Sequence, residues 1–272
     1  MSGPASGLAD TGLEVLDLRS VPEFAKRHLR ARDAAIQVEG MQRLAHAFVN
    51  RPDTILQELV NTAVELCDAE SAGISIQTKD ENDAILYHWV ATAGRYARFL
   101  NAMLPPFPSA CGICIERGQP QLFRVAQPFF ELLGVEADIV TDGLLIPWQV
   151  EETHGTIWVV AHGRQEAFDT DDCRILQALA NFAALGVRQQ RQQKILMEQA
   201  SAAAAAAMAN DLAHKINNPL QGLTNIVYLA AEGQSDGDAR ALAREMSGEL
   251  DRLSALVKKL LELPGDTVPR QP

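Results

Sequence analysis

The chain has 272 residues, long enough for one or two domains, and 47% of them are hydrophobic, which suffices for a sizeable core. A net charge of -11 argues against a nucleic-acid partner held by a basic surface and against binding to an anionic membrane. The sequence starts without the segments of a signal peptide and contains no apolar run of about 18 residues, so we expect a cytoplasmic protein without a membrane span.

Residues 1–49 are expected to form an N-terminal tail and a helix. The tail, up to about Val21, is rich in Gly, Ser, Ala and Asp and is expected to be frayed, whereas the pattern that follows is loosely helical up to Phe48. After Asp53, whose side chain suits an N-cap, apolar residues recur at steps of three and four up to Cys67. This spacing predicts a second helix.

Beyond this helix the apolar period changes from about 3.6 to 2, which predicts strands. Stretches of strand character cover residues 72–78, 84–93, 119–125, 143–150 and 155–162. A long helix is expected from the acidic, capping-prone sequence at Asp169 to about Gln193. Helices that flank strands in this order predict an α+β domain over residues 50–187, an antiparallel sheet with helices packed on it. Residues 95–130 lack a regular period and are rich in Pro and Gly, as binding loops often are.

A helical second half follows, in which one continuous helix is expected to run through residues 188–210 into a hairpin over residues 211–263. Residues 264–272 are expected to be a disordered tail. The apolar seam consists of Leu212, Ile216, Leu220, Leu223, Val227 and Ala230 on the first helix and Leu242, Met246, Leu250, Leu253, Val257 and Leu260 on the second. A lone hairpin buries such seams incompletely, so we expect a homodimer in which two hairpins form a four-helix bundle.

His214 is predicted to face away from this seam. With 100° between successive helical residues, its side chain falls on the far side of the helix, and Asn218 lies beside it one turn along. Pro219 removes the amide that would bond the carbonyl of Lys215, so the helix can bend there. By geometry alone His214 is a solvated surface histidine, although an exposed imidazole is also what a phosphoryl acceptor needs.

The sequence HKINNPLQGLTN, which begins at His214, resembles the H-box of bacterial sensor histidine kinases, whose usual form begins HEINNP. The resemblance implies that His214 is the phosphoacceptor, that Asn218 positions water when a response regulator is dephosphorylated, and that Pro219 supplies a structural kink. Lys215 replaces the family's acid, which assists by taking or orienting the imidazole proton. A lysine cannot act as a general base at neutral pH, which argues against autophosphorylation.

Kinases of this family continue with an ATP-binding domain, whereas only a short tail follows the hairpin in this sequence. We therefore expect ATP to act only through a separate domain, and a response regulator or a separate histidine kinase to be the partner. The alternative is a non-enzymatic, pseudokinase-like regulator that dimerises or docks on kinases and response regulators.

Residues 50–187 resemble a GAF domain. The sequences that carry the resemblance are SAGISI from Ser71, SACGICIERGQPQLF from Ser109 and GTIWVVAH from Gly155. This fold hosts cyclic nucleotides, bilins, haem, other metabolites or no ligand, so the resemblance leaves the ligand unknown. The tryptophans at positions 89, 148 and 158 lie on separate strands, and we expect them to fill the core rather than line a ligand site.

Cys111 and Cys114 form a C-x-x-C motif. Such a pair can be redox-active, and a cysteine can attach a chromophore, so a redox or chromophore sensor is a second alternative function. No metal site is expected, because a structural zinc ion normally takes four ligands and no second pair exists. The simpler interpretation is two small, half-buried thiols in a loop.

Overall fold

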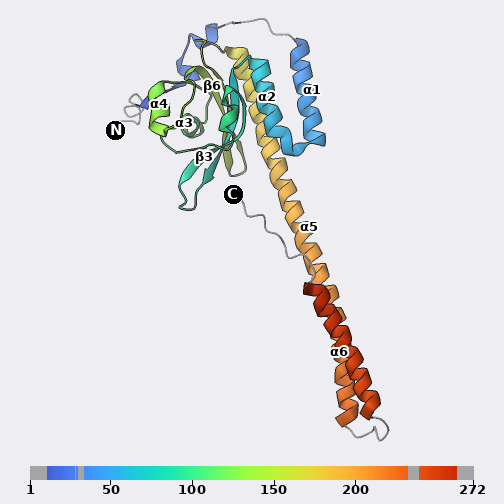
Figure 1. The fold of residues 1–272 in the computed structure, drawn as a ribbon. Helices are drawn as coiled ribbons and strands as arrows, with labels where there is room; N and C mark the ends of the chain where they lie inside the picture. The colour runs from blue at the N-terminus through green and yellow to red at the C-terminus, as the bar shows by residue number, and fades with distance from the viewer. Residues whose placement is uncertain (1–10, 28, 30–33, 232–238, 262–272) are drawn as a thin grey trace. The chain divides into compact units, whose positions relative to one another are not determined.

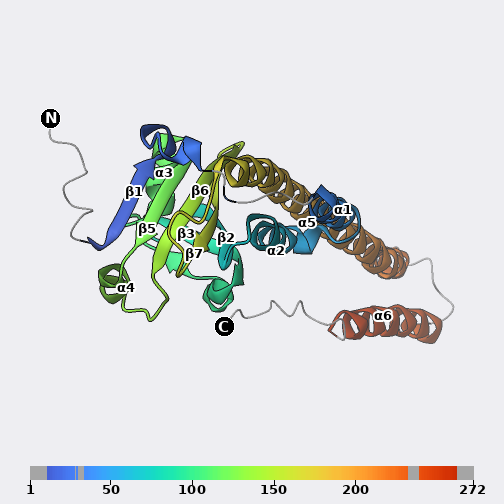
Figure 2. The ribbon, with the colours of Figure 1, turned by 90° about the horizontal axis from the view of Figure 1, so that it is seen from above.

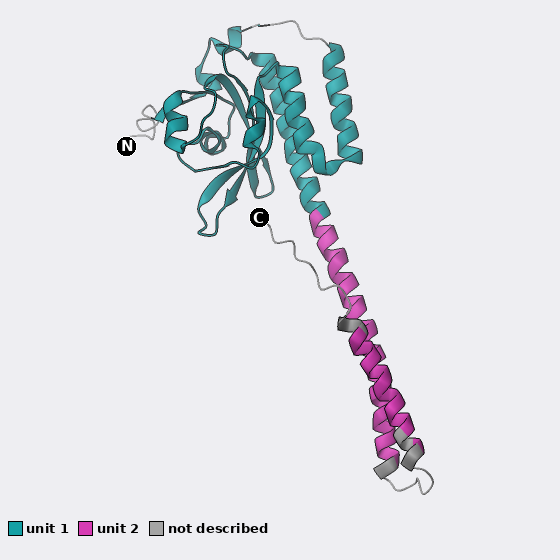
Figure 3. Cartoon of the chain, in the orientation of Figure 1, with its two compact units in different colours: residues 1–193 teal, residues 194–272 magenta. Residues whose placement is uncertain are grey.

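The computed structural model describes residues 11–27, 29, 34–231 and 239–261. The chain divides into two compact units, residues 1–193 and residues 194–272, which Figure 3 draws in different colours. The first unit holds all the strands and most of the helices among the described residues, and the second holds the helical hairpin. Among these residues, no helix combines the length and the apolar character that crossing a bilayer requires.

A seven-stranded antiparallel sheet forms the centre of the first unit, in the order β1-β5-β6-β7-β2-β3-β4. The strands are β1 (Leu13–Asp17), β2 (Ser71–Lys79), β3 (Ile85–Gly94), β4 (Met103–Leu104), β5 (Gln121–Val125), β6 (Val140–Val150) and β7 (Thr153–Ala161). The five strands expected from the period of two are all present. With the helices described next, they confirm the expected α+β fold.

Helices cover both faces of this sheet (Figures 1 and 2). The α-helices are α1 (Ala34–Asn50), α2 (Ile55–Cys67), α3 (Ala110–Arg117), α4 (Gln127–Leu133), α5 (Thr170–Ala231) and α6 (Ala239–Leu261). Short 3-10 helices are η3 (Leu18–Ser20), η4 (Phe24–Lys26), η5 (Pro52–Thr54) and η6 (Arg95–Phe99). The helices α1, α2 and the first part of α5 enclose one apolar core with the sheet, and α3 and α4 enclose a second core on the opposite face.

The N-terminal segment differs from the frayed tail that the composition suggested. Residues Leu13–Asp17 form β1, which pairs with β5 along its whole length and extends the sheet. The side chain of Leu13 is 2% exposed, so the strand also contributes to the core. The stretch of residues 95–130, which lacks a sequence period, contains η6, β4, α3, the whole of β5 and the start of α4. Short elements of this kind give too few repeats for a period to be visible.

Three glycines let aromatic rings lie flat against a neighbouring strand. A Cβ atom added at Gly73, Gly143 or Gly155 would come closer than 3.0 Å to the rings of Trp158, Phe123 and Trp148, respectively. Each ring belongs to the residue directly opposite its glycine in the antiparallel register. These glycines are therefore required by close packing.

The start of α5 is fixed by a reciprocal capping box. The Asp169 carboxylate accepts a hydrogen bond from the Asp172 amide at 3.1 Å, and the Asp172 carboxylate accepts one from the Asp169 amide at 3.0 Å. Both bonds satisfy amides that a helix N-terminus leaves without partners. The second Asp169 oxygen accepts a bond from the Leu29 amide at 3.2 Å, so the N-terminal segment is attached where α5 begins.

A buried ion pair lies close to the start of α5. The Arg27 guanidinium lies 3.1 Å from the Asp142 carboxylate on β6 and donates a second bond of 3.1 Å to the carbonyl of Phe168. The two charged residues are 8% and 1% exposed. The same Asp142 oxygen accepts a bond from the Ala167 amide at 2.9 Å. Burial raises the pKa of Asp142, and the positive charge of Arg27 opposes that rise.

The second unit consists of the remainder of α5 and the whole of α6. The helix α5 continues through Pro219, as the sequence predicted for a single helix that joins the two halves of the chain. Pro219 and Ile226 are buried, and a Cβ atom added at Gly222 would lie 3.4 Å from the Glu249 side chain of α6. The two helices of this unit thus pack against one another as a hairpin.

Candidate functional site

An apolar cavity of about 300 Å³ lies in the core between the sheet and the helices α3 and α4. Seven aromatic side chains contribute to its wall, namely Trp89, Tyr96, Phe99, Phe123, Phe129, Phe130 and Trp158. No charged side chain is among the described residues that line it. Met103 and Val135, which are 49% and 41% exposed, lie where the wall meets the surface.

The aromatic side chains of the wall contact one another. The rings of Trp89 and Trp158 lie 4.8 Å apart, and the ring of Tyr96 lies 6.1 Å from each of them. The expectation that tryptophans fill the core holds for Trp148, which packs on the opposite face of the sheet. Trp158 belongs to the second core and Trp89 packs against it, and both side chains also line the cavity.

Tyr96 is held in place by hydrogen bonds behind the cavity wall. Its hydroxyl donates to the carbonyl of Asp138 at 2.6 Å, and its amide donates to the Ser71 hydroxyl oxygen at 3.1 Å. His162 lies within 2.8 Å of the Ser71 hydroxyl through Nε2 and within 2.9 Å of the Ile139 carbonyl through Nδ1. The carbonyl can only accept a hydrogen bond, so Nδ1 donates to it. In this neutral tautomer Nε2 then accepts a hydrogen bond from the Ser71 hydroxyl. This network could not be predicted from the sequence, because its members come from separate strands and loops.

The two cysteines of the C-x-x-C motif are buried free thiols on α3. Cys111 is 5% exposed and borders the cavity, and Cys114 is fully buried with its sulfur 3.5 Å from the carbonyl oxygen of Gln119. Burial raises the pKa of both thiols. Since the thiolate is the reactive form of cysteine, this environment favours a packing role for both residues.

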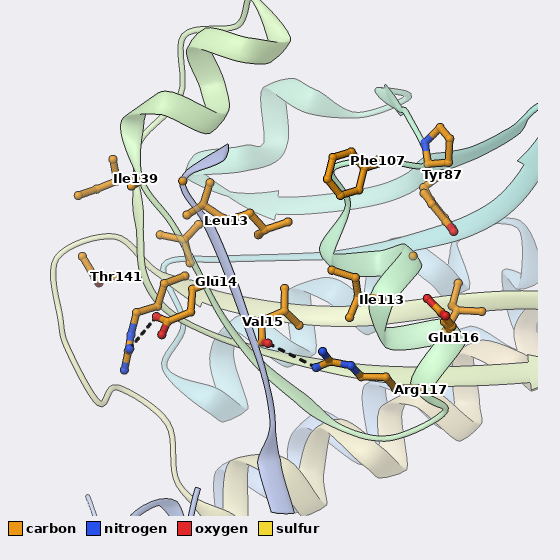
Figure 4. Close-up of a pocket in the computed structure, with 18 of the residues that line it drawn as sticks. Leu13, Glu14, Val15, Tyr87, Phe107, Ile113, Glu116, Arg117, Ile139 and Thr141 are labelled. Atoms are coloured by element: carbon orange, nitrogen blue, oxygen red, sulfur yellow. Dashed lines mark hydrogen bonds and ion pairs between the residues drawn. The ribbon is translucent and has the colours of Figure 1, made fainter. Parts of the chain in front are cut away.

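A second, larger hollow of about 1440 Å³ lies around β1. Figure 4 shows β1 passing between Ile139 and Thr141 on one side and Phe107 and Ile113 on the other. Charged side chains line it, and Arg117 donates a hydrogen bond of 3.4 Å to the carbonyl of Val15 across it (Figure 4).

The hairpin presents a polar face around His214, as the sequence predicted. His214, Lys215 and Asn218 are all exposed, whereas Pro219 is buried. Lys215 forms an ion pair of 2.7 Å with Asp211, four residues earlier. Residues three and four apart on a helix are neighbours, so a carboxylate, an imidazole and an ammonium group share one face. Asp211 is not among the predicted site residues, although the spacing of Asp211 and Lys215 is that of a helical ion pair.

The apolar seam is divided between two faces. Leu212, Ile216, Leu223, Met246 and Leu253 are half-buried within the hairpin, where Ile226 joins them at 8% exposure. Leu220, Val227, Leu250 and Val257 are instead 45%, 53%, 52% and 48% exposed. The side chains of Ala230, Leu242 and Leu260 lie outside the described residues. One hairpin therefore covers only part of the expected seam.

Comparison with known proteins gives two kinds of similarity. The model of the GAF domain family matches residues 50–188. The sensor histidine kinase ZraS of Klebsiella oxytoca is 38% identical over 81 residues, 28% of this chain and 18% of that protein. ZraS of Escherichia coli (strain K12) is 40% identical over 57 residues, 21% of this chain and 12% of that protein. The chain thus matches less than a fifth of the length of these relatives.

Solved structures resemble the first unit at low sequence identity. The GAF domain of a phosphoenolpyruvate-protein phosphotransferase from Coxiella burnetii is 18% identical, with a TM-score of 0.47, over 59% of this chain and 95% of that one. Free methionine-R-sulfoxide reductase from Neisseria meningitidis is 15% identical, with a TM-score of 0.47, over 61% of this chain and 97% of that one.

Proposed function

Because the chain belongs to the GAF domain family, we propose that its first unit is the sensory input of a two-component signalling protein whose output is the His214 face of the hairpin. The similarity to sensor histidine kinases supports this assignment. The observation that carries it is the exposure of His214, Lys215 and Asn218 together on α5, the helix that begins at the capping box of the first unit.

The proposed chemistry is phosphoryl transfer through His214. An imidazole nitrogen attacks the γ-phosphorus of ATP held by an ATP-binding domain, the bond to the leaving ADP breaks, and the ring proton passes to solvent or a nearby base. The phosphoryl group then moves to an aspartate of a response regulator. An exposed imidazole suits both steps, because each requires a different protein surface to reach it.

Lys215 has two opposing effects on phosphorylation of His214. The cation of Lys215 attracts the phosphoryl group but cannot take a proton from the imidazole at neutral pH. Their ion pair is exposed at both ends, so it contributes little to stability, and Lys215 is free to exchange Asp211 for a phosphoryl oxygen. This arrangement favours an acceptor of phosphate over a self-sufficient kinase.

The functional form is proposed to be a homodimer. The exposed seam residues Leu220, Val227, Leu250 and Val257 lie at heptad-like spacing on the two helices, and a second hairpin would cover them in a four-helix bundle. Exposed apolar residues arranged this way are typical of a helix interface.

The test is phosphorylation of the chain by phosphoramidate, a small-molecule phosphodonor, and by a histidine kinase supplied with ATP. We expect acid-labile phosphate on the wild type and its loss in His214→Ala. The matched control is His46→Ala, because His46 is an exposed helical histidine outside the motif and should leave the label intact. A label that is lost in the control but not in His214→Ala would contradict the proposal. Complete absence of label would favour the non-enzymatic regulator.

Restoring the family's acid provides a second test. We expect Lys215→Glu to raise the rate of His214 phosphorylation by a kinase with ATP about tenfold or more, because a positioned carboxylate can accept the imidazole proton. The control is Lys215→Gln, which removes the positive charge without adding a base and should give a much smaller change. Equal rates for the two variants would show that the lysine does not limit proton removal.

A further inference from the structure

The cavity of the first unit is selective in its chemistry, because its wall offers rings and aliphatic groups but no charge. An anion in such a site loses its hydration without gaining a cationic partner, which costs several-fold more free energy than burying a neutral group. Among the described residues of the wall, no Lys, Arg or His side chain could offset that loss. The site therefore disfavours ligands that carry a phosphate or a carboxylate.

Two hydrogen-bond donors in the wall lack acceptors. The Nε1 atoms of Trp89 and Trp158 are buried and have no hydrogen-bond partner among the described residues, and the Trp158 side chain is only 3% exposed. A buried N–H without an acceptor is unfavourable, and most such groups in proteins find a partner. A neutral oxygen on a bound molecule would supply one.

The size of the cavity limits the ligand further. Its volume of about 300 Å³ lies at the lower end of the range for small-molecule sites. Since one water molecule occupies about 30 Å³ of liquid, this space is roughly that of ten water molecules, enough for a molecule of roughly ten non-hydrogen atoms. A much larger ligand would require the wall to open.

We propose that this cavity binds a neutral, flat aromatic molecule of roughly ten non-hydrogen atoms that carries one oxygen acceptor, held by the aromatic wall and by an indole N–H of Trp89 or Trp158. The proposal names the ligand class for the sensory input and to that extent rests on the proposed function. The rings of the wall suit a flat ligand, because aromatic groups attract one another in stacked and edge-on contacts.

The first experiment compares the binding of a neutral naphthalene derivative with that of an anionic one. Isothermal titration of the full chain at pH 7 uses 2-naphthol, which is neutral, and 2-naphthoate, which carries the same rings and a carboxylate. We expect 2-naphthol to bind at one site at least tenfold more tightly than 2-naphthoate. Equal or tighter binding of the anion, or no binding of 2-naphthol, would overturn the proposal. The titration contains no phosphodonor, so its result is independent of whether His214 accepts phosphate.

Two matched variants locate the site. Ala137→Phe places a ring inside the cavity and should abolish binding of 2-naphthol, whereas Ala84→Phe adds the same ring at an exposed turn and should leave binding unchanged. Circular dichroism of both variants verifies that they are folded. If Ala137→Phe is folded and binds 2-naphthol as the wild type does, the probe occupies another place and the proposal fails.

The hydrogen bond is tested by removing one donor at a time. Trp89→Phe and Trp158→Phe each keep an aromatic ring and remove an N–H group. We expect one of them to weaken binding of 2-naphthol by about threefold to tenfold, the usual effect of one hydrogen bond, while binding of naphthalene, which has no oxygen, changes less. If each variant weakens the binding of 2-naphthol and of naphthalene equally, neither indole N–H donates a hydrogen bond to the ligand oxygen, and that part of the proposal fails.

Discussion

Replacing Asp142 with alanine is expected to lower the free energy of unfolding of the first unit by about 3 to 5 kcal/mol. The substitution leaves the Arg27 guanidinium, which is 8% exposed, without its buried counter-charge, and only the exposed Glu166 carboxylate at 3.7 Å remains near it. It also removes the acceptor for the Ala167 amide, which lies just before α5. Losing one partner of a buried pair is far more costly than losing an exposed pair, since the remaining charge cannot regain its hydration.

Urea denaturation followed by tryptophan fluorescence measures this loss. The matched control is Glu166→Ala, because the Glu166 carboxylate lies 3.7 Å from the same guanidinium but its side chain is 64% exposed. That variant should lose less than about 1 kcal/mol, as exposed pairs do. Similar losses for the two variants would mean that the Asp142 pair contributes no more than a surface contact.

Replacing Gly155 with valine is expected to cost about 3 kcal/mol, at the upper end of the range for overpacking. A Cβ atom there would overlap the indole ring of Trp148, and it would also approach the backbone oxygen of Ser75 at 2.5 Å. A side chain can rotate away, but the backbone in the middle of a sheet has no such freedom. The expected result is a lower midpoint in thermal unfolding with retained secondary structure at low temperature.

Gly163→Val is the control for this prediction, because no heavy atom lies within 4 Å of the position that its Cβ would occupy. It should change the free energy of unfolding by less than about 0.5 kcal/mol, as a surface substitution does. A Gly155→Val, Trp148→Leu double variant should lose less than the sum of the single variants, since a smaller side chain relieves the overlap. Additive losses would show that the ring is not the cause.

Much of the fold could be predicted from local pattern. The strands β2 and β7 are nine residues long with apolar stretches at their centres, and the 13-residue helix α2 repeats apolar residues at steps of three and four. The short helix α3 lacks that length, although Ser109 at its N-cap and Gly118 in a left-handed conformation at its C-terminal end are recognisable boundary signals. The strand β1 has no local signal, because its stability comes from a partner more than 100 residues away in sequence.

The two candidate sites differed in how far the sequence could predict them. His214 and Asn218 lie on one helix, so the 100° rotation per residue sufficed to predict their exposed face. The cavity depends on side chains from β1, β3, β4, β5, β6, β7, η6, α3 and α4, which only the tertiary fold brings together. The unpaired indole groups of Trp89 and Trp158 became apparent only with that packing.

The edge strand β1 determines where a fragment that contains the first unit must begin. The family match begins at residue 50, but β1 covers the outer edge of β5, whose residues are mostly buried. A fragment that started at the family boundary would expose the backbone hydrogen-bonding groups of β5 and an apolar surface beside them. Open edges of this kind pair with other chains. Such a fragment would be prone to aggregate, so residues from at least Thr11 onward belong with the sensory domain.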